Sequence, residues 1–413
     1  MLTRRYLEQR FQDDGDVSIS QNPARALLLF GEQPTAAGVS VTPTNAEGID
    51  TVYACVGILS DTLAGQPLEV LKILKGGGYQ PDTDSELYTL LRDLPNPEMT
   101  SFDLRVTMAR WLFLYGDAYA EIVRRPNGDI KAIWPLRSDQ MEVCRNRNTL
   151  QIEYRYRHPD GSTQTWKFNA ATPPIWHWRI NSMDGIHGRS PIRVTRESLG
   201  AVKATQQYGA RYFANGGKPG GVLSFPNKLN ADSAQRMSER WRETHGSNEH
   251  SHKVVVLEEG GTFTPITAPP EDSQFIETQA KGIESVARIF RVPPFMVGAT
   301  EKSTSWGTGI EEQKLGFVGF TMKPLFEQVE QSGKRDLLNI KTFATRKLRH
   351  DLDDLERGAM GSRYEAHERG FNRWLTVNDI RRAEHMNPLP DGDTMPTAQV
   401  TAPDPVTKEP RQP

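Results

Sequence analysis

The sequence predicts an α+β fold in which long helices accompany a small β-rich module. Apolar residues recur at helical spacing in several segments, and two of the longest lie between residues 190 and 291. Short strand-like runs separated by Asn-Gly and Asp-Gly turns occupy residues 117–177. The chain has 413 residues, of which 37% are hydrophobic. It can therefore form two or three compact domains or one elongated subunit with several parts.

Composition argues against several classes of protein. Fifty Lys and Arg residues stand against 52 Asp and Glu residues, whereas a free-standing nucleic-acid clamp is expected to be strongly basic. Two cysteines, Cys55 and Cys144, have no metal-binding spacing, which excludes a disulfide framework and favours a reducing compartment. The sequence has no run of 18 apolar residues, so no spanning helix is expected. The early acidic residues are not typical of a signal peptide.

The N-terminal third is expected to begin with a flexible arm and to continue as alternating helices and a strand. Residues 1–45 mix charges, Gly, Pro and Thr without a sustained period. A helix from about residue 50 should end before Pro67, and the following LEVLKI indicates a strand. Two more helices are expected, over 85–92 and after Ser101, which is the predicted N-cap.

Residues 117–177 are predicted to form hairpins. The strand-like runs are AYAEIVRR, IKAIWPL, MEVCR, IEYRYRH and TWKFN. The run Trp176-His177-Trp178 allows two interpretations: a catalytic histidine, or a strand histidine on a polar face opposite two buried tryptophans. The alternation favours the second interpretation. No acid–base role is assigned to Asp117, Glu121 or Asp184, because they have no partner at a defensible spacing.

The C-terminal half is predicted to be mainly helical. A helix of 25 residues, roughly 37 Å long, should begin at the Ser190-Pro191 cap and run to Asn215. An insertion with two strands and a helix precedes a second long helix over 271–291. A third helix over 309–331 should be kinked by Pro324. Charged helices at 351–374 and 377–385, the latter capped by Thr376, and a disordered tail over 396–413 complete the chain.

Three further segments contain residue types that can form binding sites. Lys302 lies in a polar loop, but Glu301 precedes it in place of the glycine of a nucleotide-binding loop, so an exposed loop is favoured. His245, His250 and His252 could hold a metal, yet a solvated turn is the simpler interpretation. One side of the first long helix is basic; its cations are Arg193, Arg196, Lys203 and Arg211. The second long helix opens with acidic residues, so the two helices could pair within or between subunits, or present a solvated face.

A series of strings in a fixed order resembles one known family. They are TVYACVGILSDTLAGQPLEV (51–70), LPNPEMTSF (94–102), YGDAYAEIVR (115–124), GRSPI (188–192), GARYFANGGKPGGVL (209–223), VARIFRVPPFMVG (286–298) and MKPLFEQVEQ (322–331). Together they resemble the portal proteins, or head–tail connectors, of tailed double-stranded-DNA bacteriophages over roughly residues 50–393. The match rests on the number, order and spacing of the strings.

The resemblance implies an elongated subunit that assembles into a twelve-subunit ring. Its implied parts are an N-terminal arm (1–45), a wing (46–190), a stem helix (191–217), a clip (218–267), a second stem helix with a Pro-Pro turn (268–297), a tunnel loop (298–309), a kinked wing/crown helix (310–339), a crown (340–395) and a tail (396–413). The stem helices have few apolar residues, so neighbouring subunits would supply the missing burial.

The implied function is a channel at the unique capsid vertex, through which DNA is packaged and later ejected. Implied partners are further copies of the chain, the large terminase subunit, the head–tail adaptor, the major capsid protein, a scaffold as a further candidate, and transiently bound double-stranded DNA. No membrane, metal or cofactor is implied, and the protein is not expected to be an enzyme. The implied location is the virion, after assembly in the host cytoplasm.

Residue roles follow from the implied parts. Weak phosphate contacts are expected from the tunnel loop, through Thr300, Lys302, Ser303, Thr304, Ser305 and Thr308. The clip is expected to dock terminase or adaptor through Arg236, Arg240, Trp241 and Arg242. Near-zero net charge suits a channel along which DNA must slide, because every neutralised phosphate adds affinity.

Three alternatives remain open at this point. A portal of a domesticated phage-like particle or gene transfer agent would share the same pattern. A nucleotide-dependent DNA enzyme or a hydrolase would need a phosphate loop or a nucleophile–base pair. A free DNA-binding regulator would need a basic recognition element.

Overall fold

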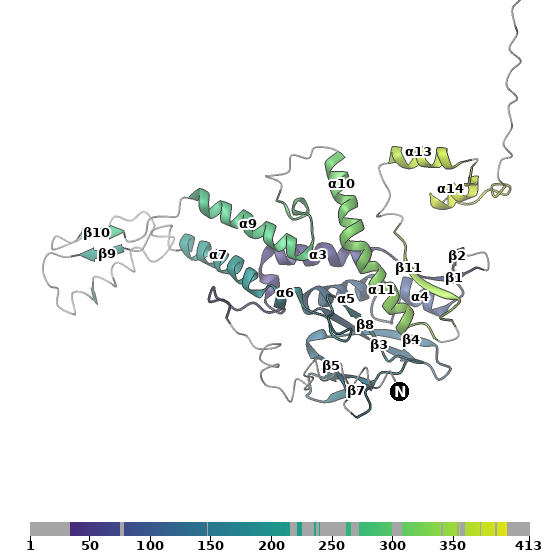
Figure 1. Cartoon of the computed structure of the whole chain (residues 1–413), viewed down its shortest axis with the longest axis horizontal. Coiled ribbons are helices and arrows are strands. Elements are labelled where there is room, and N and C mark those ends of the chain that lie inside the picture. Colours follow the sequence, from purple (N-terminus) through teal and green to yellow (C-terminus); the bar gives the residue numbers. More distant parts are fainter. Residues whose placement is uncertain are drawn as a thin grey trace, which may run out of the picture. The chain divides into compact units, whose positions relative to one another are not determined.

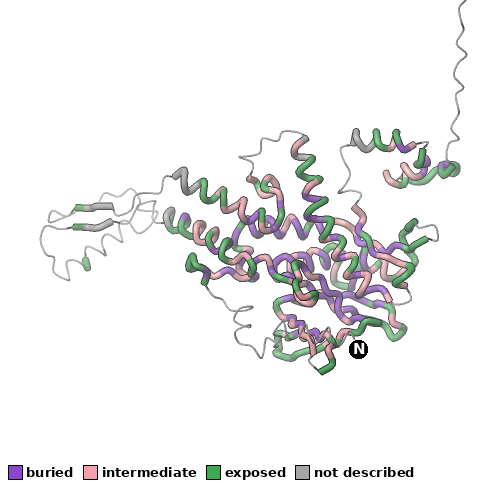
Figure 2. The backbone as a smooth tube through the Cα atoms, viewed as in Figure 1, coloured by how far each residue is buried: buried purple, intermediate pink, exposed green. Residues whose placement is uncertain are grey.

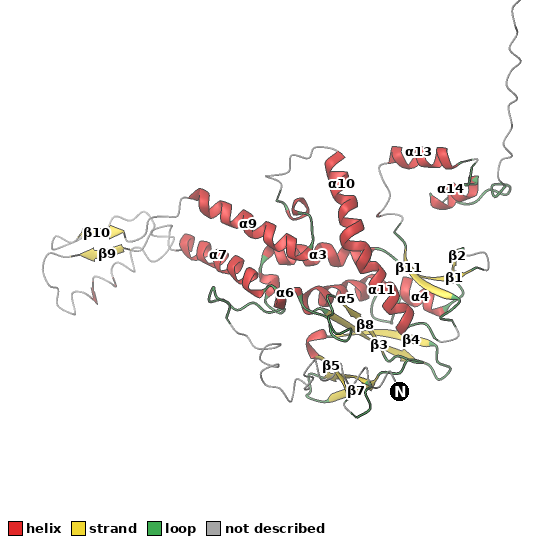
Figure 3. Ribbon diagram, viewed as in Figure 1, coloured by secondary structure: helices red, strands yellow, loops and turns green. Residues whose placement is uncertain are grey.

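The computed structural model describes residues 34–74, 78–146, 148–214, 221–224, 235–236, 239, 262–265, 272–299, 308–339, 342–352, 355, 360–371, 373–384 and 386–394. The chain divides into two compact units, Met1–Asp351 and Leu352–Pro413, each described here by itself. Helices and strands both contribute, as the sequence predicts (Figures 1 and 3).

The first unit holds most of the helices. They are α3 (Asp50–Gly65), α4 (Glu86–Arg92), α5 (Ser101–Tyr115), α6 (Pro191–Val194), α7 (Arg196–Ala214), α9 (Asp272–Phe290), α10 (Thr308–Phe317) and α11 (Lys323–Asp336). Shorter turns are the 3₁₀ segments η2 (Ala46–Gly48), η3 (Ser138–Gln140) and η5 (Pro294–Val297), and the π-helical turn η6 (Val318–Met322). The second unit contains α13 (Met360–Gly370) and α14 (Val377–Ala383).

The described strands form antiparallel sheets. They are β1 (Leu68–Ile73), β2 (Tyr79–Pro81), β3 (Asp117–Arg124), β4 (Ile130–Leu136), β5 (Met141–Arg145), β6 (Ile152–Arg157), β7 (Thr163–Lys167), β8 (Ile175–Arg179), β9 (Gly221–Ser224), β10 (Thr262–Pro265) and β11 (Arg346–His350). The strand orders are β11-β1-β2, β4-β3-β8, β5-β6-β7 and β10-β9.

The predicted hairpins over 117–177 are confirmed. Gly128, with φ of 92°, turns β3 into β4, and Gly161, with φ of 85°, turns β6 into β7. Positive φ costs glycine little, because glycine has no Cβ. The local turn signal and the alternating pattern were therefore sufficient to predict this module.

The core of the first unit lies between α3, α5 and the β4-β3-β8 sheet (Figure 2). Cys55, Leu59 and Leu63 of α3 are buried, as are Met108 and Leu112 of α5. Burial raises the pKa of the Cys55 thiol to about 12, so this thiol stays protonated and unreactive at neutral pH.

Both edges of the β4-β3-β8 sheet are covered by groups from neighbouring segments. At the β4 edge, the backbone of Ile133 donates to Pro95 O and accepts from Asn96 Nδ2, each at 2.9 Å. At the β8 edge, the His177 amide donates to Asp336 at 3.3 Å, and the Gln328 amide donates to the Arg179 carbonyl. These contacts satisfy backbone groups that an open edge would expose.

Several boundaries differ from the predictions. The N-cap of α5 is Thr100, which forms a capping box with Asp103, whereas Ser101 is the first helical residue. The predicted 25-residue helix is divided into α6 and α7 at Thr195, whose hydroxyl donates to Pro191 O at 2.8 Å and competes with the helical backbone. The kink expected at Pro324 is not at the proline itself, since the irregular turn η6 lies before it. Pro324 lies in the first turn of α11, where a missing backbone N–H donor costs no helical hydrogen bond.

The helix predicted over 351–374 is present in its described central part as α13, Met360–Gly370, and α14 is confirmed. Strand β11 precedes the predicted start and pairs with β1, so that Leu348 is buried opposite Val70. Within the predicted range the structure describes one long helix, α13. Thr376 caps α14 and forms the expected capping box with Asp379.

Arg105 joins three helices, and its partners among the described residues are carbonyls and a hydroxyl. Its guanidinium, 5% exposed, donates to Ala64 O at 3.1 and 2.7 Å, to Leu91 O at 3.0 Å, and to the Ser101 hydroxyl. Ala64 and Leu91 lie near the C-terminal ends of α3 and α4, where helix carbonyls lack helical partners and attract cations. Burial lowers the pKa of Arg105 to about 10, so the cation persists at neutral pH.

Replacing Arg105 tests this link between α3, α4 and α5. Arg105→Met should lower the free energy of unfolding by about 2–4 kcal/mol, because carbonyls at two helix ends lose a buried donor. The exposed Arg157→Met is the matched control, expected within about 0.5 kcal/mol of wild type. Urea unfolding measures both variants, and equal stabilities would contradict a structural role for Arg105.

Candidate functional site: the junction between the sheet and the α7–α9 helix pair

The junction begins where the end of α5 meets the start of α6. Gly116 caps α5 with φ of 91°, and its carbonyl accepts from Ile180 N at 2.9 Å. A Cβ on Gly188 would lie 1.9 Å from Gly116 O, and a Cβ on Gly116 would lie 2.5 Å from the backbone of Arg189. The two chain segments approach this closely only because both positions are glycine.

The Asp117 carboxylate lies in this junction and bonds to two segments. Its Oδ1 accepts from Gly188 N and from His177 Nε2, each at 2.8 Å. Burial lowers the pKa of His177 despite the neighbouring Asp117, so the ring is neutral at pH 7 and donates from Nε2. The Tyr154 hydroxyl lies 3.4 Å from the other ring nitrogen. Asp117 thus connects β3, β8 and the segment that leads into α6.

His177 does not occupy a polar face, contrary to the prediction. Its side chain is 1% exposed, because Tyr154 of the β5-β6-β7 sheet and Tyr119 cover it while Trp176 and Trp178 are buried on the other side. All of its described hydrogen bonds lie within the fold. The β5-β6-β7 sheet covers the face of β8 that was expected to be polar, so His177 is buried and not exposed.

A second carboxylate–histidine pair organises the loop between β8 and α6. Asp184 Oδ1 accepts from the backbone of Ile186 at 2.7 Å and of His187 at 2.8 Å, and Oδ2 bonds to His187 Nδ1 at 2.7 Å. His187 Nε2 bonds to Val143 O of β5 at 2.8 Å. Because both ring nitrogens face acceptors, the doubly protonated ring is favoured.

The pKa values of this pair move in opposite directions. Burial lowers the pKa of His187, but its bonds to Asp184 and to the Val143 carbonyl outweigh that effect and raise it. Burial raises the pKa of Asp184, but the hydrogen bonds from His187 and Ile186 hold it well below its ordinary range. The loop is therefore held by a charged pair near neutral pH.

Ser190 fixes the direction in which α6 leaves the junction. Its hydroxyl accepts from Arg193 N at 3.2 Å and donates to Leu114 O near the end of α5. Pro191 follows in the first helical turn. The predicted Ser-Pro cap is confirmed, and it also anchors the helix to α5.

The predicted basic side of the first long helix is partly used within the subunit. Lys203 Nζ donates to Ser40 O at 2.9 Å. Arg193 is half-buried beside Tyr115 and Asp117, and desolvation lowers its pKa. Arg196 lies 3.5 Å from the Glu197 carboxylate, and Arg211 is exposed. The four cations therefore do not form one open surface.

The described end of the N-terminal segment packs on α7. Thr35, 4% exposed, fills the space above Gly200, where a Cβ would lie 2.4 Å from its hydroxyl. The Ala36 amide donates to Glu197 at 2.9 Å. The expected flexible arm reached residue 45, but residues 34–45 have these ordered contacts; residues 1–33 lie outside the described part.

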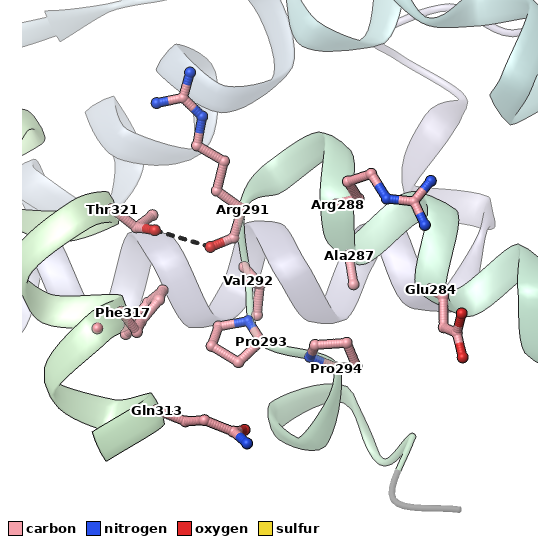
Figure 4. A pocket seen from close by; sticks show the side chains of 11 residues that line it. Glu284, Ala287, Arg288, Arg291, Val292, Pro293, Pro294, Gln313, Phe317 and Thr321 are labelled. Carbon is pink, nitrogen blue, oxygen red and sulfur yellow. Dashed lines mark hydrogen bonds between the residues drawn. The ribbon is translucent and has the colours of Figure 1, made fainter. Parts of the chain in front are cut away.

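The C-terminal end of α9 borders a pocket of about 530 Å³ (Figure 4). Val292 N donates to Ala287 O at 2.9 Å, and Arg291 takes a left-handed φ of 56°. Thr321 of η6 donates to Arg291 O at 2.9 Å. The Pro-Pro turn and α10 complete the pocket walls.

Most predicted contact residues fall outside the described part of the chain. These are Thr300, Lys302, Ser303, Thr304 and Ser305, then Arg240, Trp241 and Arg242, and also His245, His250 and His252. Thr308 is the first residue of α10, and Arg236 is helical and exposed. Among the described residues, no group of three metal-binding side chains comes together, and no helix has the length and apolar character to cross a membrane.

Sequence reasoning missed the two carboxylate–histidine pairs and the pocket at the end of α9. Gly116 lies in the string YGDAY and Gly188 in the string GRSPI, which are far apart in the sequence. Nothing in the two strings indicates that these glycines meet in the junction. A glycine directly before a strand is a signal for close backbone approach. It does not identify the partner, which only the tertiary fold provides.

Comparisons with known proteins give a consistent result. The family model described as "Phage portal protein" matches residues 50–385. The portal protein of Enterobacteria phage HK97 is 33% identical over 84% of this chain and 80% of its own length. The probable portal protein of Streptomyces phage phiC31 is 30% identical over 86% and 79%, respectively.

Two solved structures share the fold. A chain from the neck of a native gene transfer agent particle with C12 symmetry has a TM-score of 0.56 and 20% identity, covering 89% of this chain and 99% of that one. An HK97-family phage portal protein from Corynebacterium diphtheriae has a TM-score of 0.57 and 16% identity, covering 77% and 98%.

The glycine contact makes a direct prediction about stability. Gly188→Ala should lower the free energy of unfolding by about 3 kcal/mol, because the new methyl group overlaps the Gly116 carbonyl and the Asp117 carboxylate. Gly57→Ala in α3, where a Cβ meets open space, should instead stabilise by about 0.5–1 kcal/mol. Thermal or urea unfolding compares them, and a neutral Gly188→Ala would refute the close approach.

The raised pKa of His187 predicts that its contribution to folding stability falls as the pH rises. A buried neutral histidine would have the opposite effect. The pKa of His187 is raised above the ordinary value of about 6.5, so its stabilising effect is complete below that pH and is lost as the pH rises through the raised pKa. The contribution of His187 to stability should therefore decline as the pH rises above the ordinary histidine pKa of about 6.5. The loss should be smaller in His187→Gln, and unchanged in the control His158→Gln on the exposed hairpin, as measured by thermal unfolding. A full pH dependence in His187→Gln would exclude this residue.

Proposed function

The chain belongs to the phage portal protein family, and we propose that it forms the ring-shaped channel of the capsid vertex, through which double-stranded DNA is packaged and later ejected. The two curated relatives span most of the chain and carry the portal name. The single observation behind the proposal is this match over 50–385, which includes the junction and both long helices.

The α7–α9 pair supports a shared, side-by-side arrangement as the stem of the ring. α7 packs against α9 (Figure 1), yet Tyr208 of α7 is 49% exposed, and Val194, the last residue of α6, is 55% exposed. Gly282 of α9 approaches Val202 of α7, where a Cβ would make ordinary contact at 3.5 Å. A neighbouring copy in a closed ring would cover the exposed side chains of each pair.

We assign the DNA contacts to the segment between α9 and α10 on sequence grounds. One lysine, Lys302, and several hydroxyls offer weak contacts to phosphates without base recognition. Twelve copies, as in the C12 neck of the gene transfer agent particle, would place these contacts around one axis. That neck chain is similar to this chain in fold alone. The similarity is compatible with a channel role both in a phage and in a phage-like particle.

The proposed partners follow from this role. Terminase or adaptor docks on the segment between α7 and α9, where Arg236 is exposed, and capsid protein surrounds the ring. We propose that the protein is structural and that ATP hydrolysis belongs to the terminase.

Electron microscopy of the purified full chain tests the proposal. The expected result is a closed ring with a central hole wide enough for a DNA duplex. Single copies under every condition, including with capsid partners, would contradict it.

Lys302 gives a functional test of the assigned DNA segment. In a packaging assay with the terminase, Lys302→Ala should increase DNA slippage, because one phosphate contact per subunit is lost. Lys131→Ala, on an exposed position of β4, is the matched control and should behave as wild type. Identical slippage in all three proteins would remove Lys302 from the mechanism.

A further inference from the structure

A groove lies where α9 ends, between the η5 turn and α10 (Figure 4). Its accessible apolar wall is formed by the half-buried Pro293 and the exposed Pro294, while Val292 and Phe317 are buried beneath it. Gly316 of α10 also lines the groove and adds no side chain to it. The groove therefore has room and an apolar surface for side chains from another molecule.

Two arginines border this groove and carry unpaired charge. Arg288 and Arg291 are exposed, and neither guanidinium forms an ion pair with another described residue. Arg291 holds a left-handed backbone conformation at the helix end, which glycine or asparagine adopts at lower energy. Arg288 and Arg291 outnumber the carboxylate of the lining, Glu284, so the rim carries a net positive charge that favours an acidic group in the occupant of the groove.

A different side of α10 and η6 exposes large apolar side chains beside an acidic one. Leu315 is 59% and Phe320 82% exposed, and neither lines the groove of its own copy. Glu312 is exposed on the same helix and forms no ion pair within the described residues. The π-helical turn over Val318–Met322 buries Thr321 and Met322 while Phe320 stays outside. Exposed apolar groups of this size mark interaction surfaces.

We propose that the outer face of α10 and η6, formed by Glu312, Leu315 and Phe320, seats in the α9–η5 groove of a second copy of this chain. Leu315 and Phe320 would meet Pro293 and Pro294, and Glu312 would meet Arg288 or Arg291. This contact rests on the proposed function and specifies how neighbouring subunits join.

The contact is head-to-tail, because the two complementary surfaces are different parts of one subunit. Each copy offers one face and one groove, so the contact repeats from copy to copy and closes into a ring when the rotation permits. It also places the contact directly beside the segment to which the DNA contacts are assigned, since α9 and α10 flank that segment.

Charge reversal in the full chain tests the pairing. The double variant Arg288→Glu with Arg291→Glu should reduce the ring fraction in native mass spectrometry by about tenfold, which corresponds to 1.4 kcal/mol. Adding Glu312→Arg to that background should restore rings. Phe320→Ser should lower the ring fraction similarly, whereas the control Phe102→Ser, on the exposed side of α5, should not.

Mixing two defective chains identifies the geometry. Phe320→Ser retains an intact groove, and the arginine double variant retains an intact face. A mixture of the two should therefore form heterodimers with one working contact more readily than either chain pairs with itself. Loss of rings without heterodimers in the mixture would overturn the proposed pairing, as would normal rings from Phe320→Ser.

The wild-type protein shows whether the proposed function or only this contact is wrong. If wild type forms rings and the variants do so equally, the channel function stands and only this contact is wrong. If wild type forms no rings, the proposed function fails and this contact fails with it. Thermal unfolding of Phe320→Ser should match wild type, since its side chain is 82% exposed.

Discussion

The close approach of Gly116 and Gly188 around the Asp117 carboxylate is the constraint on which the remaining structure depends. It joins the end of α5, the edge strand β8 and the start of α6 at one point, and it leaves no space for a side chain at either glycine. Because Ser190 then anchors α6 to α5, the direction of the long helices is set by this junction. In the proposed ring this direction has to be the same in every copy, because each copy presents the same surfaces to its neighbours.

Buried polar groups in the first unit serve the same purpose. Arg105 connects the ends of α3 and α4, and Asp336 of α11 bonds to the His177 amide at the β8 edge. Asp184 and His187 attach the junction loop to β5. Each group is satisfied within the subunit, so its benefit is positional. The exposed Tyr208 and Phe320, by contrast, have apolar surface that the single copy does not cover.

The parts of the fold that sequence predicted are those determined locally. The hairpin turns at Gly128 and Gly161 and the Thr376 capping box need only neighbouring residues. Strand β11 was missed because its pairing partner, β1, lies far away in sequence and its own residues are mostly charged. The Asp117–His177 bond was missed for the same reason, since it joins two strands that become neighbours only in the folded sheet. The family could be recognised from ordered strings, whereas the groove at the end of α9 required the packing of α10.

A reconstruction of the assembled ring by electron cryomicroscopy tests the central claim most directly. The account predicts that the Gly116–Gly188 contact and the Asp117 bonds are the same in every subunit, with α7 and α9 side by side around the channel axis. A ring in which this junction opens, or in which α7 and α9 point away from the axis, would contradict it.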